Sequence, residues 1–233
     1  MNNTLRLKYL EAMGIDVWMS RSPVQARRPL PAAALGNNEP ATGGWEALQT
    51  EVSGCTKCTL CETRTQTVFG TGNKNADWLL IGEAPGQHED EQGKPFVGNA
   101  GQLLTEMIRA MGLTREEVFI TNIIKCRPPR NRDPHADEVE SCHDYLQRQL
   151  AIIQPKIILA VGRIAAQTLL DTDLPLARLR GKVHTLNNTP LVVVYHPAYL
   201  LRSLLEKRKA WQDLLLAMKT VTNLRRDTSG SQH

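Results

Sequence analysis

The stretch that decides the fold is residues 78–86, which read WLLIGEAPG. Four apolar residues run directly into a turn that contains glycine and proline, the pattern of a buried strand followed by a loop. Three other short apolar runs, rich in β-branched residues, predict further strands at 118–124, 157–161 and 191–195. We therefore expect a sheet with four strands.

Helical segments separate these strands along the chain. Residues 99–111 carry apolar side chains at positions 100, 103, 104, 107, 108 and 111, the spacing of one helix face. Residues 137–153, the segment that ends at Leu170 and residues 211–218 also predict helices. Strands that alternate with helices indicate an α/β fold with a mostly parallel sheet, in which ligands bind beyond the carboxyl ends of the strands. Polar residues or turn formers follow three of the four predicted strands, at 82–86, 121–131 and 196–202.

The composition is that of an ordinary globular chain. The 233 residues are 41% hydrophobic and 22% charged, and the 5% of aromatic residues do not indicate an aromatic stacking platform. The net charge of +4 permits a nucleic-acid partner without arguing for one. No apolar run approaches the ~20 residues that cross a bilayer, and Glu11 and Asp16 interrupt a secretory pattern. We expect a cytoplasmic monomer with no membrane partner.

The folded domain is expected to span residues 45–225, and a disordered polar tail is expected at 226–233. Residues 1–44 predict a short N-terminal helix and then a disordered linker rich in proline, alanine and glycine. We favour an inert extension for this segment over a helix that docks an unknown partner protein.

Five cysteines are too few, and too odd in number, for a disulfide framework. Cys55 and Cys58 have the spacing that turns two sulfurs toward one metal, whereas Cys126 and Cys142 flank a basic, proline-rich loop. A zinc site would have an unusually wide second pair, and Thr65 interrupts a ferredoxin-type run. A cuboidal iron–sulfur cluster with scattered ligands fits the spacing best, and buried free thiols are the alternative.

The strand-end motifs form an ordered set. They are GEAPG at 82–86, GKPFVGNAG at 93–101, FITNIIKCRPPRNR at 119–132 and HPAYLLR at 196–202. Over about residues 45–220 this set strongly resembles the iron–sulfur uracil-DNA glycosylases, the group called family 4. The resemblance implies a three-layer α/β/α fold around a four-stranded, mostly parallel sheet. It also implies a four-iron, four-sulfur (4Fe-4S) cluster bound by Cys55, Cys58, Cys126 and Cys142, and it leaves Cys61 outside the ligand set.

The same resemblance implies a DNA repair enzyme that acts on uracil-containing DNA. Such an enzyme flips uracil out of the helix, hydrolyses the N-glycosidic bond, releases free uracil and leaves an abasic site. Asn122 is expected to read the base edge and Phe96 to stack on its face. His196, as a neutral imidazole, is expected to stabilise the charge that develops on uracil O2. Taken singly, these residues could equally be a turn Asn, a core Phe and a His satisfied by the backbone.

The residue that positions the attacking water is harder to assign. Ala84 stands where some relatives in the wider superfamily carry Asp or Asn, so we expect Glu83 to orient the water and contact the substrate. Glu89 and Asp90 are further candidates, and Glu89 could instead crowd uracil C5 and exclude thymine.

Two groups of basic residues adjoin the expected pocket. We expect five of them to bind DNA phosphates: Lys125, Arg127, Arg130, Arg132 and Arg202. Residues 196–202 are expected to push the base out of the duplex, with apolar tips at 199–201. Solvated basic faces, without a DNA contact, are the alternative.

Some members of the wider superfamily trap the sugar covalently on a histidine in an inserted basic loop. We do not favour this mechanism here, because residues 179–184 resemble that loop in composition but carry no clear insertion. From another class, the alternative is an iron–sulfur DNA-binding or redox-sensing protein without glycosylase activity.

Overall fold

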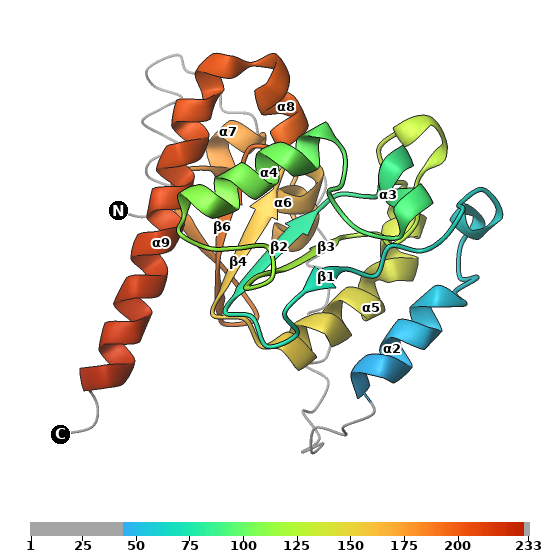
Figure 1. Ribbon diagram of the computed structural model, residues 1–233, viewed down its shortest axis with the longest axis horizontal. Helices are drawn as coiled ribbons and strands as arrows, with labels where there is room; N and C mark the ends of the chain where they lie inside the picture. The colour runs from blue at the N-terminus through green and yellow to red at the C-terminus, as the bar shows by residue number, and fades with distance from the viewer. Residues whose placement is uncertain (1–43, 231–233) are drawn as a thin grey trace, which may run out of the picture. The chain divides into compact units, whose positions relative to one another are not determined.

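A six-stranded sheet organises this computed structural model, which describes residues 44–230 (Figure 1). The strand order is β1-β3-β2-β4-β6-β5. The strands are β1 (Thr71–Gly72), β2 (Trp78–Gly82), β3 (Phe119–Asn122), β4 (Ile157–Val161), β5 (Val183–Leu186) and β6 (Thr189–Val194). The expected helix and linker before residue 44 lie outside the described residues.

The α/β class and the mostly parallel sheet are confirmed. The four predicted strands, β3, β2, β4 and β6, pair in parallel, and each edge adds an antiparallel strand that was not predicted. At one edge β5 forms a hairpin with β6 through Asn187 and Asn188, which have φ of 47° and 66°. Asparagine tolerates this left-handed backbone, which tight hairpin turns require.

Helices cover both faces of the sheet (Figure 1). On one face, α2 (Gly44–Ser53), α5 (Ala136–Ile153) and α6 (Arg163–Leu170) pack against the side chains of Leu79 and Ile81. On the other face, α4 (Asn99–Ala110), α8 (Pro197–Arg202) and α9 (Lys207–Gly230) pack against Trp78 and Leu80. Successive side chains of β2 therefore pack into two separate hydrophobic cores, because the side chains of a strand point alternately to the two faces of the sheet.

Shorter elements connect these layers. They are the helices α3 (Gln87–Gln92) and α7 (Leu176–Leu179), and the 3-10 turns η1 (Thr59–Glu62), η2 (Pro129–Asn131) and η3 (Leu204–Glu206). The last helix continues to Gly230, whereas a disordered tail was expected from residue 226; the domain boundaries stay predictions. Within the described part of the chain, no helix is long and apolar enough to cross a membrane.

The carboxyl ends of the parallel strands meet at one edge of the sheet. Gly82, the last residue of β2, pairs with Asn122, the last residue of β3. On the other side, Val161 of β4 pairs with Val194 of β6. The residues that follow these strands, Glu83 and His196 among them, are therefore gathered at one end of the sheet.

Candidate active site

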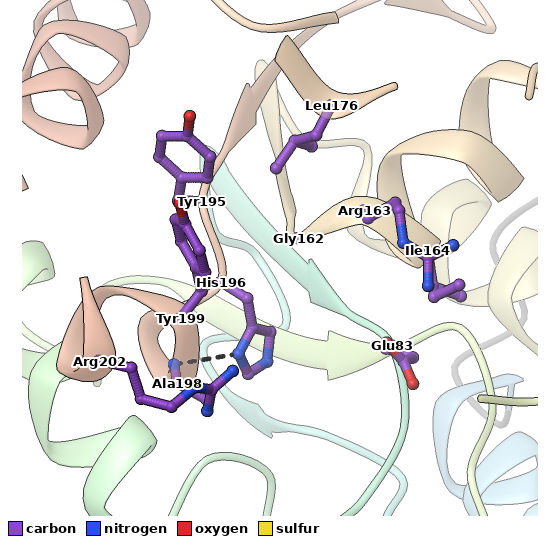
Figure 2. A pocket seen from close by; sticks show the side chains of 10 residues that line it. All are labelled: Glu83, Gly162, Arg163, Ile164, Leu176, Tyr195, His196, Ala198, Tyr199 and Arg202. Carbon is purple, nitrogen blue, oxygen red and sulfur yellow. Dashed lines mark hydrogen bonds between the residues drawn. The ribbon is translucent and has the colours of Figure 1, made fainter. Parts of the chain in front are cut away.

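A cavity of about 500 Å³ opens at the carboxyl ends of the strands. It is lined by Glu83, Glu89, Phe96, Asn122 and His196, all singled out for contact with the substrate, and by Ala84, the neighbour of Glu83 that we also expect to contact it. A second cavity of about 310 Å³ shares Glu83, His196 and Arg202 with the first. In Figure 2, His196 and Tyr199 lie on one side of this second cavity, and Glu83 and Arg163 lie on the other. The two cavities therefore meet at Glu83 and His196, two of the residues predicted to act in catalysis.

Asn122 lines the first cavity with a buried side-chain amide. The residue is only 1% exposed, and its Oδ1 has no hydrogen-bond partner among the described residues. An unpaired buried carbonyl costs about 1–3 kcal/mol. The amide is fixed by close packing, because a Cβ at Gly82 would lie 2.5 Å from Asn122 Oδ1 and 2.6 Å from Phe96 Cζ. Only glycine at position 82 allows the amide and the aromatic ring to approach this closely.

His196 is held as a neutral hydrogen-bond donor. It caps α8, and its Nδ1 accepts a hydrogen bond of 3.1 Å from the backbone N–H of Ala198 (Figure 2). Because Nδ1 accepts, the proton of the neutral ring is on Nε2. Burial, with a contribution from Arg202, lowers the pKa of His196 to about 4, although Glu89 opposes the shift. Its ring centroid lies 5.7 Å from that of Phe96.

Glu83 combines a position between the two cavities with a perturbed acidity. Burial raises the pKa of its carboxyl to about 7, and the charge of Asp133 adds to the shift while Arg163 opposes it. Asp133 also lines the first cavity and pairs with Arg163 at 2.6 Å. A carboxyl with a pKa near neutrality can exchange a proton at physiological pH. No sequence motif pointed to Asp133, because its place beside Glu83 depends on the fold.

The other two candidates for positioning water are engaged elsewhere. The Glu89 carboxylate accepts hydrogen bonds from the backbone N–H groups of Gly86, Val97 and Gly98 at 2.9–3.2 Å. Asp90 is buried outside the cavity lining and accepts from the backbone of Thr65 at 3.0 Å. Glu83 is therefore the candidate with a carboxylate that borders the cavity and has no such backbone partners in the described structure.

Four of the five basic residues predicted to bind DNA have at least partly exposed side chains. Arg130 and Arg202 are exposed, while Arg127 donates to Asn131 Oδ1 at 2.7 Å. Arg132 forms a bidentate pair with the buried Glu138 at 2.6 and 2.8 Å, which leaves it a partly exposed cation beside the cavity.

The fifth prediction, Lys125 as a phosphate contact, is wrong. Its side chain is 1% exposed, and its ammonium donates to Thr121 Oγ1, Asn122 O and Gln149 Oε1 at 2.6–2.8 Å. Burial lowers the pKa of Lys125 to about 7. The residue supports the end of β3 from behind and does not reach solvent.

One of the three apolar tips predicted at 199–201, Leu200, needs correction. Leu200 is 1% exposed and packs in the core, because it lies on the inner face of α8. Tyr199 and Leu201 are exposed, and the turn η3 beyond them presents Leu204 and the 92% exposed Leu205. The most exposed apolar side chain of this region, Leu205, therefore lies three residues beyond the end of the predicted wedge segment at 196–202.

The four predicted cysteine ligands converge on one side of the sheet. Cys126 and Cys142 are buried in the same core, and Cys55 and Cys58 pack against it. Arg64 bridges two parts of the set, because its Nη1 donates to Cys126 Sγ at 3.0 Å and its Nη2 to Cys55 O at 2.6 Å. Within the described residues, no three Cys, His, Asp or Glu side chains are close enough to hold a single metal ion. A 4Fe-4S cluster is held by four cysteine thiolates, and the four predicted ligands lie in or against one core.

The strand-end cavity brings together an aromatic ring, a buried amide with an unpaired oxygen and a neutral imidazole. α/β enzymes that bind a planar heterocycle have groups of this kind at the strand ends. Residues 69–215 match the family model of the Uracil DNA glycosylase superfamily. The chain belongs to this superfamily and, within it, to the type-4 uracil-DNA glycosylases, as the sequence motifs predicted.

Individual relatives agree with this assignment. The chain is 48% identical to a type-4 uracil-DNA glycosylase of Archaeoglobus fulgidus over 159 residues, which cover 65% of this chain and 80% of the relative. It is 41% identical to that of Thermotoga maritima over 160 residues, or 68% of this chain and 83% of the relative. Similarity to a type-5 uracil-DNA glycosylase of Pyrobaculum aerophilum is lower, at 30% over 146 residues, or 55% of this chain and 64% of the relative.

Proposed function

We propose that the chain is a monofunctional DNA-repair glycosylase that hydrolyses the bond between uracil and deoxyribose in DNA. The products are free uracil and an abasic site. The observation that carries this function is the unpaired Oδ1 of Asn122, set beside Phe96 and His196 in a cavity at the strand ends. The family assignment agrees with it, and no finding favours a DNA-binding or redox-sensing protein without this activity.

Recognition of uracil rests on Asn122 and Phe96. The amide Oδ1 accepts from uracil N3–H, and the amide nitrogen donates to O4. Cytosine has an acceptor at N3 and a donor at N4, so it would leave the buried amide mismatched, which costs about 1–3 kcal/mol for each unsatisfied group. The flipped base stacks on Phe96, a contact worth about 1–3 kcal/mol.

Departure of the base is assisted by His196. The bond breaks toward uracil, which takes the bonding electron pair as an anion with charge on O2, while the sugar becomes cationic. The Nε2–H of the neutral imidazole donates to O2 as the charge develops. Removal of one such donor costs other enzymes about 2.7–4 kcal/mol in the transition state. With a pKa of about 4, His196 keeps this neutral form throughout the physiological range.

Water then attacks the sugar from the side of Glu83. The ionised carboxylate orients the water and stabilises the sugar cation, and it accepts the proton that the water loses on forming the abasic hydroxyl. The pKa of about 7 makes about half of the carboxyl groups ionised at neutral pH.

Contacts to DNA outside the cavity involve two kinds of side chain. Arg127, Arg130 and Arg202 offer cations to the phosphates, so we expect binding to weaken as salt rises. Leu205, together with the exposed Tyr199 and Leu201 of the predicted tips, is an apolar side chain suited to fill the space that the flipped base leaves in a duplex.

We infer that Cys55, Cys58, Cys126 and Cys142 hold a 4Fe-4S cluster. The convergence of the four thiols and the bond from Arg64 to Cys126 support it. The cluster would tie residues 55–58 to both ends of the loop between Cys126 and Cys142, and this loop carries cavity residues such as Arg132. The monomeric state and the cytoplasmic location stay predictions.

The experiment that tests the proposed function is uracil release from a single-stranded oligonucleotide with one uracil, followed by alkaline cleavage on a gel. Cleavage at the uracil position, with free uracil in the supernatant, is expected. If the protein binds the oligonucleotide but yields neither strand cleavage nor free uracil, the alternative, a DNA-binding or redox-sensing protein without glycosylase activity, would be supported.

A further inference from the structure

Phe96 has a backbone conformation that aromatic residues rarely adopt. Its φ is 54°, in the left-handed region, and the residue is only 7% exposed where it lines the cavity. For a residue other than glycine such a conformation is strained and persists only where the surroundings impose it. The loop is also pressed against α4, because a Cβ at Gly101 would lie 1.8 Å from Phe96 O.

Two charged side chains hold this loop from opposite ends of the peptide groups. The Glu89 carboxylate accepts from the N–H groups of Val97 and Gly98 at 2.9 and 3.2 Å. The Arg115 guanidinium donates to the carbonyl oxygens of Pro95 and Phe96, at 2.9 and 3.2 Å. The two backbone N–H groups that follow Phe96, and the carbonyl groups of Phe96 and of the residue before it, are thus all hydrogen-bonded to charged side chains.

Arg115 does this without touching the substrate cavity. It follows α4 in the chain, lines neither of the two cavities and is half-buried behind the loop. Its Nη1 also donates to Thr105 Oγ1 of α4 at 3.1 Å, which anchors the guanidinium to a helix. A planar guanidinium presents several donors in fixed directions, so it can bridge two carbonyls and a hydroxyl at once.

We propose that Arg115 is a positioning residue for uracil, which holds the strained Phe96 backbone so that the ring faces the cavity before the base arrives. This proposal rests on the proposed function of the same cavity. Without Arg115, the loop can relax toward negative φ, and the ring loses its fixed place against Gly82 and Asn122. The base then has to order the platform when it binds, so affinity falls.

The test is Arg115→Met, which keeps the length of the side chain but removes its donors. We expect KM for a single-stranded uracil oligonucleotide and the inhibition constant of free uracil to rise together by about tenfold. kcat should change less than about threefold, since stacking stabilises bound substrate and transition state alike. Arg115→Lys, which offers one ammonium in place of a fork, should recover part of the loss. Arg109→Met, an exposed arginine of α4 paired with Glu106, is the matched control and should match the wild type.

A double-mutant cycle distinguishes positioning from a general loss of structure. In a Phe96→Ala background, Arg115→Met should have no further effect on KM or on inhibition by uracil, because the platform it holds is gone. An equal loss in both backgrounds would overturn the proposal, as would unchanged inhibition by uracil in Arg115→Met. An inactive wild type would overturn the proposed function, and this inference with it, whereas an active wild type with an unaffected Arg115→Met overturns the inference alone.

Discussion

Replacement of Gly82 by alanine tests the geometry of the cavity with a single methyl group. Gly82 ends β2, and its missing side chain leaves room for two neighbours. The added Cβ would lie 2.5 Å from Asn122 Oδ1 and 2.6 Å from Phe96 Cζ. Ordinary contacts of a Cβ lie at 3.4–4 Å, so the amide and the ring must each retreat by about 1 Å.

The magnitude follows from that displacement. A misplacement of about 1 Å in a catalytic arrangement costs about 100-fold in rate, which corresponds to about 2.7 kcal/mol at 1.36 kcal/mol for each factor of ten. Overpacking lowers the free energy of unfolding by about 1–3 kcal/mol, or roughly 2–12 °C in Tm for a domain of this size. The variant should therefore remain folded at moderate temperature while it loses most of its activity.

The assay is kcat/KM for uracil release from a single-stranded oligonucleotide. It is measured at a temperature well below the Tm of the variant, so that the variant is folded. We expect a loss of about 100-fold for Gly82→Ala. Gly44→Ala, where the new Cβ would meet only Ile152, at 3.9 Å, among the described residues, controls for a methyl group added elsewhere and should match the wild type. A folded Gly82→Ala enzyme with kcat/KM within about threefold of wild type would refute the packing argument.

Three further predictions concern proton transfer, the cluster and the duplex. Because Glu83 has a pKa raised to about 7 and acts when ionised, kcat/KM should rise with pH through about 7 and level off above it. Glu83→Gln should remove this inflection. A flat pH profile of the wild type would contradict the role of Glu83 in orienting and deprotonating the water. Purified protein should be brown and contain iron and sulfide, and Cys142→Ser should lose colour and lower the Tm; colourless wild type with bound zinc would contradict the cluster. Leu205→Ala should change stability by less than about 0.5 kcal/mol but slow release from duplex more than from single strands; equal slowing on both would exclude the wedge.

The parallel core of the sheet could be predicted because its strands are apolar on both faces. β2 and β4 are buried at every position, which gives the continuous apolar runs seen in the sequence. The edge strands carry no such signal. β1 has two residues, and β5 alternates between exposed and partly exposed positions, so neither differs in pattern from a loop.

The cavity could be predicted because parallel strands bring distant motifs to one end of the sheet. Local sequence does not show the direction of a side chain, and this explains the errors. Lys125 follows β3 in a basic stretch, yet its ammonium donates hydrogen bonds to three oxygens inside the fold. Leu200 lies between exposed neighbours but faces the core. Arg115 lies in no motif, and its relation to Phe96 exists only once α4 packs beside the loop.

The most direct test of the central claim compares the wild type with Asn122→Ala on two otherwise identical oligonucleotides, one with uracil and one with cytosine at the same position. The wild type should release uracil and leave cytosine intact, whereas Asn122→Ala should remain folded and lose uracil release by at least about 100-fold, since the base is no longer held by its edge. Wild-type activity that is retained in Asn122→Ala, or equal release of the two bases, would contradict the claim that this cavity recognises and excises uracil.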